Sequence, residues 1–131
     1  MQSFFSQPQR EVILSVGKTL MPCHFRKVNY TVALFKTNPG SLENILSGTG
    51  LKPGLKWGNG SVVALGLIRY TDSDLGAYDE VILSAPSIPL DAKKPFSNWL
   101  NMVGPLTTRK VGHYIFHIPV TSSFSEAAGK E

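Results

Sequence analysis

The chain has 131 residues, a length that suits one domain. With 42% hydrophobic and 17% charged residues, it can bury a core and is too apolar to be disordered. The formal net charge is +4, but the basic residues are scattered and no nucleic-acid-binding module is recognisable, so no nucleic-acid partner is expected.

Cysteine content and hydropathy indicate the compartment. Cys23 is the only cysteine, so the chain has no internal disulfide, which fits a reducing environment. The first residues do not resemble a signal peptide, and no stretch approaches the roughly 20 apolar residues that span a bilayer. We therefore expect a cytoplasmic protein without a membrane partner.

The first half of the chain predicts one strand and one helix after an N-terminal extension, residues 1–20. Within that extension, the segment from Glu11 to Leu20 fits either a strand or a short helix, because its periodicity does not decide. Alternating apolar and polar residues, many of them β-branched or aromatic, predict a strand from Val28 to Lys36. Asn38-Pro39 then predicts the start of a helix that ends at Gly48.

The second half predicts further strands. Pro53 and the glycines of 51–60 indicate a loop, and the almost wholly apolar segment 61–70 indicates a strand buried on both faces. A turn over 71–77 leads into a strand from Tyr78 to Ala85, which Pro86 is expected to end.

The last third begins with the least regular segment, 91–110, in which Trp99 and Leu100 are expected to pack as an apolar anchor. A strand follows over 112–120, and residues 123–131 read as a helix. With at least four strands and little helix, the predicted fold is mainly β (α+β).

Metal and cofactor chemistry finds no support in the sequence. His113 and His117 would lie about 13 Å apart along a strand, too far to share one ion. Motifs for a serine nucleophile or for nucleotide phosphates are missing. We expect no metal and no cofactor.

Glu80 is the one carboxylate placed for a role beyond turn formation. It begins an apolar strand on the same face as Ile82 and Ser84. Two interpretations remain open: the side chain either points into a cavity, where burial would raise its pKa, or lies in water at the strand end.

The order of motifs resembles acetoacetate decarboxylase-like proteins. The segment Thr71 to Pro86 resembles the family stretch in which a Gly and a Tyr precede a Glu at a strand start. The segment Val111 to Val120 resembles the next core strand, and Ala128 to Glu131 (A-G-K-E) resembles the following G-[RK]-E motif. The resemblance runs from about residue 21 to the end, and residues 21–131 are interpreted as part of such a domain.

The resemblance implies part of a cone-like antiparallel β-barrel around a pocket for small keto or carboxylic acids. Glu80 matches a glutamate of the family, Arg26 is the nearest candidate for its pocket arginine, and Tyr114 is a further candidate for the pocket. Enzymes of the family use a Schiff-base lysine, which needs a lowered pKa to attack a carbonyl. That lysine follows the G-[RK]-E motif, and this chain ends at Glu131.

Three functions therefore remain open. The chain binds a small organic acid without a catalytic residue; it is the amino-terminal half of a lyase whose lysine lies beyond residue 131; or it is a non-functional truncated product. The first is expected, with no catalytic residue assigned. A homo-oligomer remains open.

Overall fold

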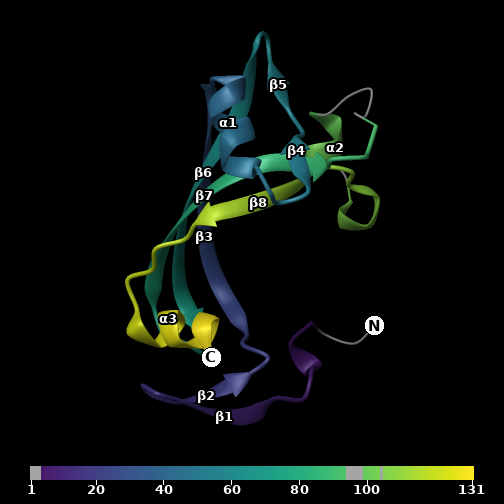
Figure 1. Cartoon of the computed structure of the whole chain (residues 1–131). Coiled ribbons are helices and arrows are strands. Elements are labelled where there is room, and N and C mark those ends of the chain that lie inside the picture. The colour runs from purple at the N-terminus through teal and green to yellow at the C-terminus, as the bar shows by residue number, and fades with distance from the viewer. Residues whose placement is uncertain (1–3, 94–98, 104) are drawn as a thin grey trace. The chain divides into compact units, whose positions relative to one another are not determined.

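The computed structural model describes residues 4–93, 99–103 and 105–131 (Figure 1). Its contacts divide the chain into two compact units. The first unit contains Met1–Thr31, Leu67–Val81 and Pro119–Glu131, and the second contains Val32–Gly66 and Ile82–Ile118.

The fold is mainly β and antiparallel, as the sequence predicts. Three long strands, β3 (Phe25–Thr37), β6 (Gly60–Ser73) and β7 (Tyr78–Pro89), contribute residues to both units. They belong to a six-stranded sheet with the order β3-β6-β7-β4, in which β5 also pairs with β6 and β8 with β7. Among the described residues these pairings do not close into a barrel.

The first unit begins with a short 3-10 helix, η1 (Phe4–Ser6), and a two-stranded hairpin of β1 (Arg10–Leu14) and β2 (Gly17–Met21). The undecided segment of the sequence is therefore two strands, joined at a turn where Gly17 has a φ of 143°. The ring of Phe124 would lie 3.0 Å from a Cβ at Gly17. Phe124 comes from helix α3 (Ser123–Lys130), so α3 packs closely on this hairpin.

The second unit contains the remaining elements. In chain order they are α1 (Pro39–Leu46), β4 (Leu51–Pro53), β5 (Lys56–Trp57), α2 (Leu100–Val103), the 3-10 helix η2 (Leu106–Thr108) and β8 (Gly112–His117). None of the helices in the described part of the chain is long and apolar enough to cross a membrane.

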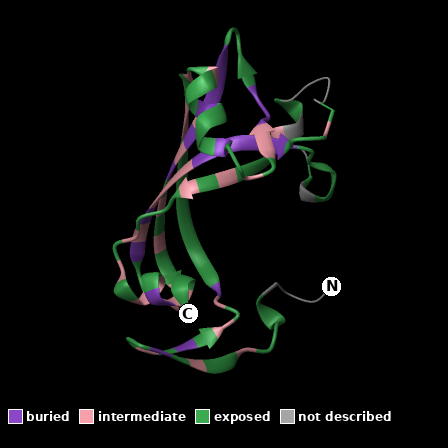
Figure 2. Ribbon diagram, in the orientation of Figure 1, coloured by how far each residue is buried: buried purple, intermediate pink, exposed green. Residues whose placement is uncertain are grey.

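Two clusters form the core of the second unit (Figure 2). One joins residues that lie far apart in the sequence: Leu55, Val62, Ile88 and Val111. The other packs the buried face of α1 against β7 through Leu42, Leu46 and Ala85. Burying a leucine side chain contributes about 1.5–3 kcal/mol, so these contacts hold α1 on the sheet.

The predicted capping of α1 is confirmed. The side chain of Asn38 accepts a hydrogen bond of 2.9 Å from the backbone N–H of Gly40, and Pro39 occupies the first helical position. Gly48 follows the helix with a φ of 76°, a conformation that glycine adopts without steric cost. Helix α3 has an equivalent cap, because Ser122 accepts from the N–H of Ser125.

Several predictions about the strands are corrected. The predicted loop 51–60 contains β4 and β5, because Lys52 pairs with Ile88 and Lys56 with Ser61. The strand expected to end at Pro86 continues to Pro89, and the carbonyl of Pro86 accepts from Gly54 at 2.8 Å. The sequence predicts that β6 is buried on both faces, and this is confirmed only for its first half. In the second half, half-buried and exposed residues alternate.

The predicted apolar anchor is wrong for Leu100, which is 70% exposed. Trp99 is 42% exposed, and its ring meets that of Trp57 edge to face at 6.2 Å. Met102, one turn further along α2, packs against the core instead. The strand predicted over 112–120 is shorter than expected, ending at His117, although Tyr114 and Phe116 do face the core cluster as its alternation implies.

Candidate functional site

Glu80 lies on β7 in the first unit and is only 9% exposed. Its carboxylate oxygen is 3.5 Å from the hydroxyl of Tyr70, which is placed to donate to it. Burial raises the pKa of Glu80, and the Tyr70 hydroxyl opposes that rise. The residue also lines a hollow of about 460 Å³ together with Asn29, Thr31 and residues of β6.

Tyr70, the neighbour of the Glu80 carboxylate, belongs to a group of packed aromatic rings. The rings of Tyr70 and Tyr78 lie 4.4 Å apart and nearly parallel, and Phe25 contacts Tyr70 at 4.9 Å. Burial, followed by the charge of Glu80, raises the pKa of Tyr70 well above its ordinary value, and burial also raises the pKa of Tyr78. Both hydroxyls therefore stay protonated and can donate hydrogen bonds.

Arg26 is held by two carboxylates of the same unit. Its guanidinium pairs with Asp72 at 3.2 Å and with the almost fully buried carboxylate of Asp74. Arg26 does not line the hollow of Glu80. Its ion pairs connect β3 to the end of β6 and to the turn that follows, which assigns the guanidinium a structural role.

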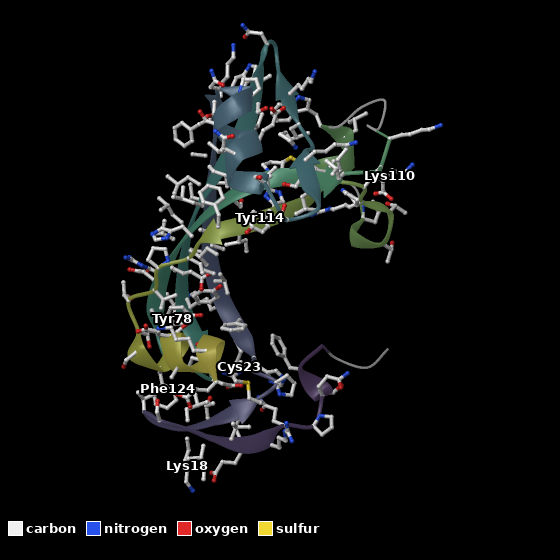
Figure 3. The ribbon with its side chains drawn as sticks, in the orientation of Figure 1. Lys18, Cys23, Tyr78, Lys110, Tyr114 and Phe124 are labelled. Carbon is white, nitrogen blue, oxygen red and sulfur yellow. The ribbon has the colours of Figure 1, made fainter. Side chains whose placement is uncertain are left out.

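Tyr114 belongs to the second unit, whereas Glu80 and Arg26 belong to the first. On β8 it lies opposite Ala85 and packs against the core cluster that contains Leu42. Tyr114, labelled in Figure 3, also lines a hollow of about 660 Å³ beside β8. The structure therefore places the three predicted site residues in two separate environments.

We call this hollow the β8 hollow, and its lining is basic. Three basic side chains contribute to it, and none of the lining residues that the structure describes is acidic. These residues are Leu51, Ser87, Pro89, Arg109, Lys110, Val111, Gly112, His113 and Tyr114. An anionic group entering the hollow would therefore meet positive charge and hydroxyl groups.

His113 is the titratable group with a perturbed pKa in the β8 hollow. The residue as a whole is exposed, but partial burial of its ring lowers the pKa, and the nearby charge of Arg109 lowers it further. The ring nitrogen Nδ1 lies 3.1 Å from the hydroxyl of Ser84, which orients the imidazole. At neutral pH the ring is uncharged, so the positive charge of the hollow comes from Arg109 and Lys110.

From the sequence alone, Arg109 and Lys110 are only two of the scattered basic residues of the chain. The signal for a site is that the basic pair lies just before the strand that carries His113 and Tyr114. Recognising it requires knowing that β8 pairs with β7 and that Ser87 lines the same hollow.

No cluster of three or more metal-ligating side chains occurs among the residues that the structure describes. No family model matches the chain, and no curated protein or solved structure matches it. Its function therefore has to be inferred from its own residues and their geometry.

Proposed function

We propose that the second unit binds a small organic acid in the β8 hollow. The observation that carries this proposal is the lining, which combines the charged side chains of Arg109 and Lys110 with no acidic side chain among the described residues. A hollow of about 660 Å³ lies within the roughly 300–1,000 Å³ typical of small-molecule sites. Hydrogen bonds from charged donors to a carboxylate are the stronger kind, each contributing about 1.5–3 kcal/mol.

The charge distribution of the chain supports an anionic ligand. The second unit has seven basic and two acidic residues in the sequence, whereas the first has six basic and seven acidic residues. The net positive charge of the protein is therefore carried by the unit that contains the β8 hollow. Such a field attracts an anion and raises its local concentration near the site.

The remaining lining groups suit a keto acid. Lys110 supplies a point charge for the carboxylate, and the hydroxyl of Tyr114 can donate to a carbonyl oxygen. Leu51 and Val111 provide apolar surface for a short carbon chain. The ligand class is thus a small carboxylic acid, with a carbonyl group as the second recognised feature.

We further propose that the antiparallel strands form part of a cone-like β-barrel of the acetoacetate decarboxylase type. The order of the sequence motifs and the mainly antiparallel sheet support this proposal. The main alternative function is a lyase that uses a Schiff-base lysine. On either function a small keto acid is the ligand, so one set of compounds tests both.

Isothermal titration calorimetry with acetoacetate tests the binding proposal. We expect saturable binding that weakens about tenfold in Lys110→Ala, since one charge-assisted hydrogen bond is lost. Lys27→Ala removes the same charge from an exposed position in the first unit and should bind as the unaltered protein does. Equal affinity for acetoacetate and for its uncharged methyl ester would refute the proposal.

Borohydride reduction in the presence of acetoacetate separates the binding function from the lyase. A Schiff base is trapped as a stable secondary amine, which adds mass to one lysine. We expect no modified peptide from this chain. Modification localised to Lys110 by peptide mass spectrometry would replace the binding function with a catalytic one.

A further inference from the structure

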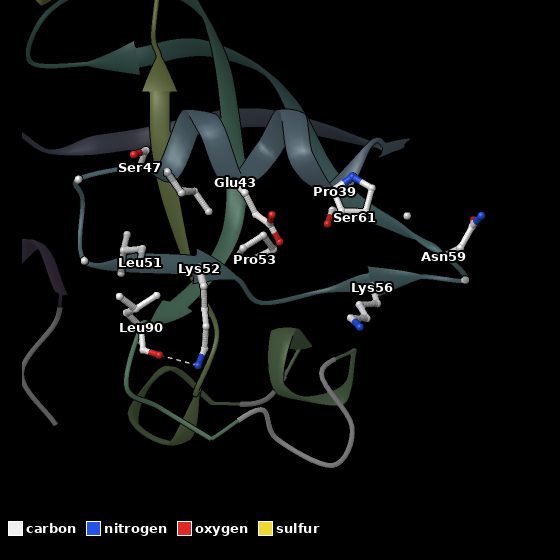
Figure 4. Close-up of a pocket in the computed structure, with 15 residues that line it drawn as sticks. Pro39, Glu43, Ser47, Leu51, Lys52, Pro53, Lys56, Asn59, Ser61 and Leu90 are labelled. Carbon is white, nitrogen blue, oxygen red and sulfur yellow. Dashed lines mark hydrogen bonds between the residues drawn. The ribbon is translucent and has the colours of Figure 1, made fainter.

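A second hollow of the second unit, about 690 Å³ in volume, lies between helix α1 and the β4–β5 segment (Figure 4). We call it the α1 hollow. It is built mainly by one continuous stretch, residues 39–61, together with Leu90. Among the described residues, Leu51 alone lines both this hollow and the β8 hollow, so the two have different linings.

The α1 side of this hollow is negative. Glu43 lies on α1, and the last turn of the helix contributes Leu46 and Ser47 to the lining. Backbone carbonyls at the end of a helix carry partial negative charge, and α1 has no basic residue in its last turn to offset it. Within the described part of the chain, Glu43 forms no ion pair. This wall favours a cationic group.

The strand side is positive. Lys52 on β4 donates to the carbonyl of Leu90 at 2.6 Å, which fixes its ammonium group at the edge of the hollow. Lys56 on β5 has no ion pair with any residue that the structure describes. This wall favours an anionic group, in contrast to the α1 side.

Uncharged polar side chains and two glycines complete the lining. Ser61 is 4% exposed and still reaches the hollow, and Asn59 is held by a hydrogen bond of 2.6 Å from Lys36. Gly48 and Gly50 both have positive φ, and a Cβ at either would meet no atom within 4 Å, so this turn leaves open space beside the hollow.

We propose that the α1 hollow binds a zwitterion of the amino acid type, either a free amino acid or a short peptide. Its ammonium group would face Glu43 and the end of α1, and its carboxylate would face Lys56. A simple anion would be repelled by Glu43 and a simple cation by the two lysines, whereas a molecule with both charges satisfies both walls. This site is separate from the organic-acid site and does not depend on it.

Titration of the isotope-labelled protein, followed by amide chemical shifts, tests the proposal with two series of probes. One series consists of free amino acids, and the other of the corresponding dipeptides. We expect saturable shifts at residues 43–61 with at least one series. Tighter binding of the free amino acids identifies the single residue as the ligand, and tighter binding of the dipeptides identifies a peptide.

Blocked analogues test the charge requirement without altering the protein. N-acetylated amino acid amides lack both charges and should give no saturable shifts in this hollow. Binding of a blocked analogue with the affinity of its parent would overturn the proposal. The same conclusion would follow if neither series of charged probes bound.

Matched variants test the assigned groups. Glu43→Gln and Lys56→Gln should each weaken binding about tenfold, because each removes one charged partner. Glu126→Gln and Lys27→Gln make the same chemical changes in the first unit and should leave binding unchanged. Both altered residues of the hollow are exposed, and circular dichroism would check that each variant folds. Unchanged affinity in both hollow variants would refute the proposal.

Discussion

Asp74 is the carboxylate on which the contacts of the first unit converge, and its charge should stabilise the fold. Its side chain is 6% exposed and accepts hydrogen bonds from the backbone N–H of His24 at 2.8 Å and from Gln9 at 2.5 Å. Arg26 adds an ion pair. We predict that Asp74→Asn, which keeps the shape and removes the charge, destabilises the protein at neutral pH.

The magnitude follows from the pKa of Asp74. Burial by itself would raise this pKa, but the His24 amide, Arg26 and Gln9 together lower it from 3.8 to about 2. Without solvent screening, this lowering of the pKa corresponds to a contribution of about 2.4 kcal/mol to the free energy of unfolding. Because Arg26 is partly exposed and water screens its charge, we expect a loss of about 1–2 kcal/mol.

Urea unfolding followed by circular dichroism at several pH values tests this reasoning. A carboxylate with a lowered pKa stabilises the fold above its unfolded pKa, and that stability disappears as the pH falls toward about 2. The difference between the unaltered protein and Asp74→Asn should therefore be full at pH 7 and shrink below about pH 4. Asp72→Asn is the control, because Asp72 is an exposed partner of Arg26, and it should lower the free energy of unfolding by less. A difference that stays constant from pH 7 to pH 3 would refute an electrostatic origin.

Two further predictions concern the packing of glycines and the electrostatics of the β8 hollow. Gly60→Ala should lower the free energy of unfolding by about 1–3 kcal/mol, because the new Cβ would lie 2.6 Å from Lys36 and 2.9 Å from the carbonyl of Thr37. Gly129→Ala in α3 meets no atom within 4 Å and should stabilise by about 0.5 kcal/mol in the same urea assay; equal effects at both positions would argue against a steric cause. Arg109→Gln should raise the pKa of His113 in an NMR titration, and an unchanged titration would show that burial alone sets it.

Local sequence patterns predicted the secondary structure correctly where the contacts that stabilise an element join residues close in the sequence. The start of α1 follows from Asn38 and Pro39, and that of α3 from Ser122, because a cap joins residues only two or three positions apart. The strand β3 and the turn after β6 follow in the same way from β-branched residues and aspartates. The burial of Glu80 did not follow in this way, because its place at the start of an apolar strand left two interpretations open.

The functional geometry depends on pairings between distant segments. β4 and β5 form in a stretch rich in glycine and proline because β7 and β6 supply their partners, with Lys52 pairing with Ile88. Arg26 finds its carboxylates 46 and 48 residues away, which turns a predicted pocket residue into part of an ion-pair network.

The sequence by itself determined the mainly β class and the capped helices, whereas the burial of Glu80 was decided by the structure. Only the tertiary structure decided that Tyr114 shares a hollow with Lys110 and that Glu80 lies in the other unit. The physical reason is that strand propensity is local, whereas the register of a sheet is set by which distant strands meet. That register decides which side chains line the same hollow.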